Sequence, residues 1–116
     1  MTLTQGTIAQ ALIVPARGKA KRRPVVIYTP TNLIPTQHKV GVVGISGSYY
    51  PDSDCIPLPW RADGRVPTRL TRQCAIVLDL IDEIEKESLE PTGGYVSDAV
   101  LVELVERLKK RRVSFP

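Results

Sequence analysis

A cluster of basic residues that leads directly into an apolar segment is the part of this sequence best suited to chemistry. Five of the seven residues in this cluster are basic: Arg17, Lys19, Lys21, Arg22 and Arg23. Pro24 ends the run of basic residues, and the β-branched residues 25–27 that follow predict a buried strand. A strand fixes the backbone of the residue that precedes it, so Arg23 can direct its guanidinium toward one phosphate oxygen.

Short β-branched or alternating segments predict about five strands, which must position these side chains. They cover residues 6–14, 25–29, 40–46, 55–60 and 74–81. Pro57 and Pro59 cannot donate to a ladder, so 55–60 is expected at a sheet edge. Gly41 and Gly44 indicate a strongly curved barrel, and the very apolar segment 74–81 is expected at its centre.

The last third of the chain predicts a helix. Residues 82–89 are acidic and fit one helical turn, 91–94 fit a loop, and Ser97 suits a helix N-cap. An apolar stripe at helical spacing follows, made of Val100, Leu101, Leu104, Val105 and Leu108. The expected fold class is therefore mainly β with a C-terminal helix (α+β). It is a single small barrel over residues 1–116, with a terminal amphipathic helix and loosely ordered ends at 1–5 and 111–116.

Composition favours an anionic partner and a cytoplasmic protein. The net charge is +4 and the pI about 9.3, which suits a polyanion such as nucleic acid. Cys55 and Cys74 lie among apolar residues and are expected to be reduced. With His38 the single histidine and no metal-ligand spacing, we expect neither a metal site nor a cofactor. No apolar run has the length of a membrane span.

The order of these segments resembles the MazF/PemK family of toxin endoribonucleases. The pieces are Arg-Pro-Val-Val-Ile at 23–27, Gly-Ile-Ser at 44–46, a Pro-rich segment, the apolar strand 74–81, Leu89, and Gly-Tyr-Val-Ser-Asp at 94–98. They occur in one collinear order over about residues 6–110. The family's first loop has a Gly-Ser-Glu-Gln type sequence where this chain has 18–22, and an Arg-Thr pair where it has Asp82 and Glu83.

The resemblance implies an SH3-like, CcdB-like barrel that forms a homodimer, with an RNA groove across the dimer. It also implies an antitoxin whose disordered tail occupies that groove. Arg23 takes the place of the catalytic arginine, Ser46 that of a threonine at the end of the third strand, and Asp79 that of an acidic residue proposed as catalytic. The residues expected to contact RNA are Arg17, Lys19, Lys21, Arg22, Ser48 and Tyr49.

These residue types fit metal-independent, sequence-selective cleavage of single-stranded RNA through its own 2′-hydroxyl. That reaction needs proton transfer and neutralisation of charge at the phosphate, which Arg23 and a Ser46 hydrogen bond would supply. Plainer interpretations stay open: Arg23 as a surface cation, Ser46 as a turn residue, Asp79 as the partner of an arginine. Tyr49, Tyr50 and Trp60 fit base stacking or a small satellite core. Two alternative functions remain: a gyrase-poisoning toxin of the same superfamily and a barrel that binds nucleic acid without cleaving it.

Overall fold

The computed structural model describes residues 3–13, 19–49 and 54–113. Its elements are β1 (Thr7–Ile13), β2 (Lys21–Ile27), the 3-10 helix η1 (Thr31–Thr36), β3 (Lys39–Ser46), β4 (Cys55–Pro57), β5 (Ala75–Glu85), the 3-10 turn η2 (Lys86–Ser88), β6 (Glu90–Tyr95) and α1 (Asp98–Lys110). The expected class, mainly β with one helix at the C-terminal end, is confirmed.

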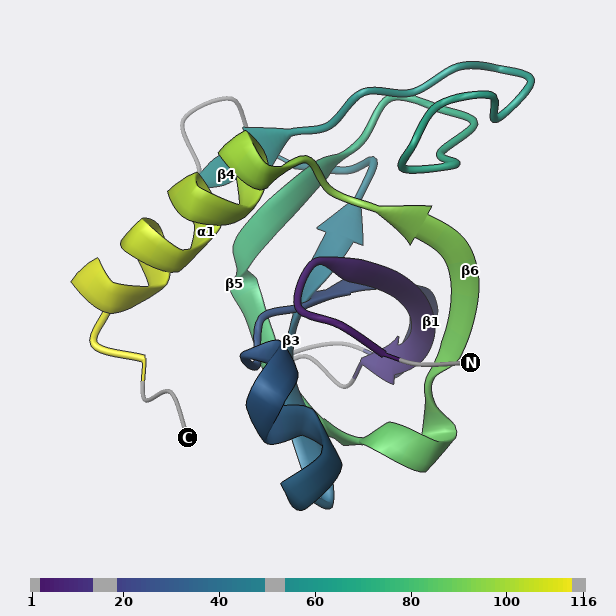
Figure 1. The fold of residues 1–116 in the computed structure, drawn as a ribbon. Coiled ribbons are helices and arrows are strands. Elements are labelled where there is room, and N and C mark those ends of the chain that lie inside the picture. Colours follow the sequence, from purple (N-terminus) through teal and green to yellow (C-terminus); the bar gives the residue numbers. More distant parts are fainter. Residues whose placement is uncertain (1–2, 14–18, 50–53, 114–116) are drawn as a thin grey trace.

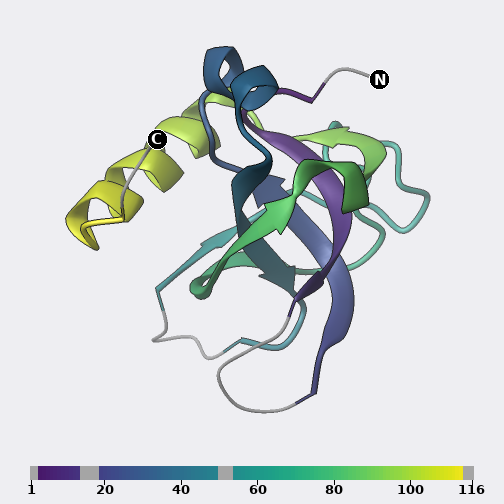
Figure 2. The same cartoon turned by 90° about the horizontal axis from the view of Figure 1, so that it is seen from below.

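The strands form one antiparallel sheet in the order β4-β5-β3-β2-β1-β6. The sheet curves into a half-barrel, with α1 along one side (Figure 1; Figure 2 gives the view from below). The proline-containing strand β4 lies at an edge, as predicted. The central position predicted for 74–81 is wrong, because β5 lies beside that edge strand and β3 and β2 occupy the middle.

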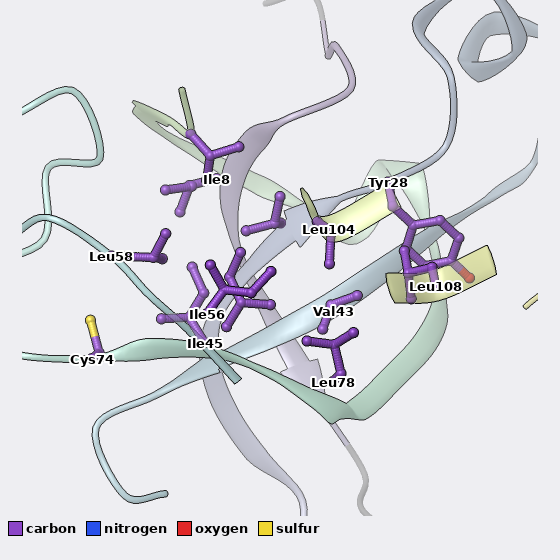
Figure 3. Packing of buried hydrophobic residues seen from close by; sticks show 13 residues of the cluster. Ile8, Tyr28, Val43, Ile45, Ile56, Leu58, Cys74, Leu78, Leu104 and Leu108 are labelled. Atoms are coloured by element: carbon purple, nitrogen blue, oxygen red, sulfur yellow. The ribbon is translucent and has the colours of Figure 1, made fainter. Parts of the chain in front are cut away.

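Apolar side chains cover both faces of the sheet and form two clusters. The helix-side cluster contains strand residues together with Leu104 and Leu108 of α1, which point into it (Figure 3). The opposite cluster packs against η1 through Ile34. Neighbouring residues of β2 alternate between the clusters, with Val26 in the first and Val25 in the second. This alternation is the period of two expected of a strand that is buried on both faces.

The C-terminal helix begins at the predicted cap and is tied to the sheet by two arginines. The Ser97 hydroxyl accepts a hydrogen bond from the Val100 backbone N–H at 3.3 Å. Arg107 donates to Asp54 at 2.8 Å, and Arg111 donates to the same carboxylate at 3.1 Å. Arg111 also reaches Asp79 at 2.8 Å. The helix therefore holds the chain immediately before β4.

Three elements differ from the sequence prediction. β2 begins at Lys21 rather than near 25, because its basic residues pair with the end of β1. β5 continues to Glu85 along β3, which leaves only Lys86–Ser88 for the predicted helical turn. The predicted loop 91–94 is wrong, because this segment is part of β6. A Cβ on Gly94 would lie 2.2 Å from the Thr68 carbonyl oxygen, so glycine here serves close packing rather than a turn.

Side chains also hold parts of the ends that were expected to be loosely ordered. Gln5 donates from its side-chain amide to the Tyr28 carbonyl at 2.8 Å, and Arg111 makes the bonds to Asp54 and Asp79. Within the described residues, no helix combines the length and apolar character needed to span a membrane.

Replacing Leu104 by alanine should test the docking of the helix. Leu104 is 0% exposed, whereas Val102 on the same helix is 58% exposed. Leu104→Ala is expected to lower the free energy of unfolding by about 2–5 kcal/mol, because it leaves a cavity in the helix-side cluster. Val102→Ala should change it by less than about 0.5 kcal/mol. Urea unfolding of both variants checks this, and equal effects would contradict the described packing.

Candidate functional site

A groove with a volume of about 620 Å³ lies where the ends of β2 and β3 meet the segment 68–74. We call it the basic groove. It is lined by Ile8, Gln10, Lys21, Arg22, Arg23, Pro24, Ile45, Ser46, Gly47, Ser48, Thr68, Arg69, Leu70, Thr71, Arg72, Gln73, Cys74 and Thr92. Among these lining residues five are Lys or Arg and none is Asp or Glu. Such a surface attracts anions and gives them no like charge to overcome.

The pairing of β2 with β3 brings Arg23 and Ser46 to the same end of the two strands. The paired residues run from Ile27 with Val42 to Val25 with Gly44. Arg23 lies two residues before Val25, and Ser46 lies two residues after Gly44. Both residues line the basic groove. One phosphate group bound there could contact both side chains.

Arg23 carries an unpaired donor in a confined position. Its Nε is buried and has no hydrogen-bond partner. The side chain passes over Gly44, where an added Cβ would lie 3.4 Å from the Arg23 Cδ and 2.8 Å from the Leu80 Cβ. A buried donor without a partner costs about 1–3 kcal/mol, and an anionic oxygen is the partner a guanidinium prefers.

The Ser46 hydroxyl closes a small turn at the end of β3. It donates to the Ser48 carbonyl at 3.1 Å and accepts from the Ser48 backbone N–H at 3.1 Å. The plainer interpretation of Ser46, a residue that satisfies a turn, therefore describes a real contact. Hydroxyl hydrogens rotate freely, so Ser46 can donate to a ligand oxygen by giving up the bond to Ser48.

Residues 68–74 form the other wall. They belong to the segment 58–74, which stands out from the sheet near one end of β6 (Figure 1). Thr68 anchors it by donating to the Pro59 carbonyl at 2.7 Å, and the Tyr95 N–H donates to the Pro67 carbonyl at 3.0 Å. It places Arg69 and Arg72 in the groove. Sequence reasoning assigned these two arginines no contact with RNA, although four arginines between 61 and 72 were the available signal.

Cys74 lies in the groove wall as a neutral thiol. Burial raises the pKa of the Cys74 thiol, and the nearby charge of Arg72 offsets this only in part. A thiol reacts as a nucleophile only after deprotonation. Both cysteines are free, Cys74 buried and Cys55 partly exposed. Burial therefore works against a nucleophilic role for Cys74 at neutral pH.

The structure places the other predicted residues as follows. Lys21, Arg22 and Ser48 line the groove, whereas Lys19 and Tyr49 are not among its lining residues. Arg22 also pairs with Glu90, with 2.5 Å between Nη2 and Oε2. Arg17 and Tyr50 lie outside the described residues.

Asp79 lies apart from the basic groove. It is not among the lining residues, and its carboxylate accepts a hydrogen bond from the Arg111 Nη2 at 2.8 Å. The plainer interpretation, a carboxylate that pairs with an arginine, thus matches its surroundings. The groove contains two of the three predicted catalytic residues.

Solved structures of MazF share this architecture. MazF (form I) from Deinococcus radiodurans matches with a TM-score of 0.75 and 15% sequence identity, over 98% of this chain and 99% of that chain. Structures of MazE-MazF from the same organism match with TM-scores of 0.72 (form III) and 0.71 (form II). Their identities are 16% and 13%, over 97% and 98% of this chain and 97% and 99% of the matched chains.

No model of a protein family matches the sequence, and no curated protein matches it. At these identities the structural likeness concerns the fold. The chain has the MazF fold, an antiparallel half-barrel with a C-terminal helix, as the sequence resemblance predicted.

Alkylation of Cys74 should begin at a higher pH in the folded protein than in the unfolded chain. The raised pKa means that the folded state keeps this proton while the unfolded state releases it. The contribution of Cys74 to the free energy of unfolding should therefore be fully present below the pKa of the thiol in the unfolded chain. It should be lost as the pH rises through the higher pKa of the thiol in the folded protein. Iodoacetamide labelling of Cys55→Ser, followed by mass spectrometry with and without urea, measures the shift. Equal pH profiles in the two states would contradict it.

Proposed function

We propose that this chain is a MazF-like endoribonuclease that cuts single-stranded RNA, without a metal, through attack of the RNA's 2′-hydroxyl. The observation that carries the proposal is that Arg23 and Ser46 both line a groove that has five cations and, among its described lining residues, no carboxylate. The MazF fold supports it independently. We further propose that Arg17, Lys19, Lys21, Arg22, Ser48 and Tyr49 contact the RNA.

The proposed chemistry assigns one task to each residue of the pair. The Arg23 guanidinium neutralises the charge that builds on the phosphate and takes part in proton transfer. Its Nε is buried, so the terminal amino groups of the guanidinium would contact the phosphate. The Ser46 hydroxyl donates to a non-bridging oxygen. Because attack uses the 2′-hydroxyl, DNA at the cut position would not be cleaved.

The proposed partners follow from the same groove. A MazE-MazF complex is known for the matched fold, and we propose a corresponding antitoxin whose disordered tail lies in the basic groove of a homodimer. Carboxylates on such a tail would pair with the five cations of the groove. RNA and antitoxin would then compete for one site, in the cytoplasm where mRNA is found.

A barrel that binds nucleic acid without cutting it is the second candidate. The described lining residues include no histidine and no carboxylate to accept a proton, and the Ser46 hydroxyl is engaged with Ser48. Cleavage would thus depend on arginine, which is a weak proton acceptor. In such a barrel the nucleic acid would bind the same groove and the same cations, and Arg23 would have only a binding role.

Replacing Arg23 by alanine tests the choice between the two candidates. In EDTA, the wild-type chain should cut a long unstructured RNA into discrete fragments, and Arg23→Ala should slow cutting by about 100-fold or more. Arg65→Ala serves as the control, because Arg65 is exposed and is not among the lining residues. Size-exclusion chromatography should show the same oligomeric state for all three proteins.

The alternatives predict different results in that assay. Retarded but intact RNA with the wild-type chain would favour the binding barrel, and intact RNA with inhibited gyrase would favour a gyrase poison. Cutting by Arg23→Ala at the wild-type rate would remove Arg23 from the mechanism.

Asp79→Asn should leave cutting within about twofold of the wild type, because its carboxylate lies outside the groove lining and pairs with Arg111. The lost pair should cost at most about 1 kcal/mol of stability, as for other exposed pairs. Asp54→Asn should cost more, because Asp54 binds both Arg107 and Arg111. Cleavage rates and urea unfolding measure the two effects. A folded Asp79→Asn protein that had lost its activity would instead make Asp79 catalytic.

A further inference from the structure

Arg69 has a backbone conformation that arginine rarely adopts. Its φ is +57°, in the left-handed region. It is the last residue of a turn in which its N–H donates to the Val66 carbonyl at 2.9 Å, a position where glycine is preferred. Among the described residues, the other non-glycine residue with positive φ is Arg112. Arg112 follows the end of α1, where this conformation is ordinary; Arg69 has no helix end to account for it.

The Arg69 guanidinium rests on Gly93 of β6. A Cβ added to Gly93 would lie 3.0 Å from the Arg69 Cζ and 3.1 Å from its Nε. The side chain of any other residue there would push the guanidinium away. The next residue, Gly94, makes similar room for the Thr68 carbonyl. Two consecutive glycines therefore let the turn 66–69 lie directly against β6.

The charge of Arg69 is available to a ligand. Its side chain makes no ion pair and no hydrogen bond within the described part of the chain, in contrast to Arg61, which pairs with Asp63 at 3.1 Å. Arg69 lines the basic groove, which has no carboxylate among its described lining residues. Arg72, also in the lining, adds a second cation to the same wall.

We infer that Arg69 forms a second phosphate-binding position in the basic groove, separate from the one at Arg23. This rests on the proposed function in so far as the ligand is a single-stranded nucleic acid. Strand β1 lies between β2, which carries Arg23, and β6, which supports Arg69. Two strand spacings are roughly 10 Å along the sheet, so the two arginines approach the groove from different strands and can each take a different phosphate of one nucleic acid chain.

The second position would fix the direction and register of the bound strand. A single phosphate contact lets the bound nucleic acid rotate about that point. Two contacts supported by different β-strands of a rigid sheet define the path of the nucleic acid across the groove. Contacts to phosphate position the nucleic acid and carry no sequence information themselves. Arg69 is therefore a positioning residue for the bond held at Arg23, and it should affect binding more than the chemical step.

Arg69→Asn separates a binding role from a structural one. Asparagine removes the charge but tolerates the left-handed conformation better than arginine, so the melting temperature should stay equal or rise. Affinity for an uncleavable 2′-O-methyl RNA oligonucleotide, measured by fluorescence anisotropy, should fall about 5- to 20-fold, and the slope of log K against log salt should decrease by about 0.7. Arg65→Asn is the matched control: it removes the same charge from the same segment outside the groove and should change neither quantity.

Arg69→Lys keeps a charge without the planar fork and should retain most of the salt slope. Wild-type affinity in Arg69→Asn would overturn the inference and leave the proposed function intact. A lowered melting temperature with equal losses in the Asn and Lys variants would also overturn it, because it would show a structural role. A wild-type chain that does not bind the oligonucleotide at all would instead refute the proposed function.

Discussion

The register between β2 and β3 is the constraint on which the rest of the site depends. Residues project alternately from the two faces of a sheet, so a shift of one residue would move Arg23 to the face opposite Ser46. Burial does not fix this register, because Val25, Val26 and Ile27 are all fully buried and would be buried after a shift as well.

Gly41 of β3 favours the observed register instead. A Cβ on Gly41 would lie 2.2 Å from the ring of Tyr28, the residue that follows β2. A slip of β2 against β3 by one residue would bring the side chain of Val40 or Val42 against that ring, at the cost of a steric clash. Gly44 of the same strand packs against Leu80 of β5 and provides the space for the Arg23 side chain.

The sequence predicts the parts of the site that depend on local pattern. The apolar runs, Pro24 and Ser97 locate β2 and α1, and the strand-end positions of Arg23 and Ser46 suggest that they meet. Other parts depend on contacts between distant segments. Pro91 and two glycines indicate a loop locally, yet pairing with β1 makes 90–95 a strand. Arg69 reaches the groove only because the segment 58–74 folds back on β6, which no local propensity encodes.

Pairing within the fold decides which of the many cations can bind a partner. In the basic run at the end of α1, Arg107 and Arg111 are engaged with Asp54, Glu103 and Asp79. In the groove, by contrast, the one ion pair that a lining cation makes within the described residues is that of Arg22 with Glu90, and both partners are largely exposed.

Two local departures from favourable structure occur in this same groove. Arg23 has the buried unpaired nitrogen of the described residues, and Arg69 has the left-handed backbone that no helix end explains. Each costs the fold about 1–3 kcal/mol, which the two apolar clusters must offset. A phosphate at the Arg69 guanidinium would leave its backbone conformation unchanged, and the buried Arg23 Nε is out of reach of a ligand. Both departures therefore cost the folded chain stability with or without a bound anion. Local costs of this kind are found in natural proteins chiefly where structure serves function.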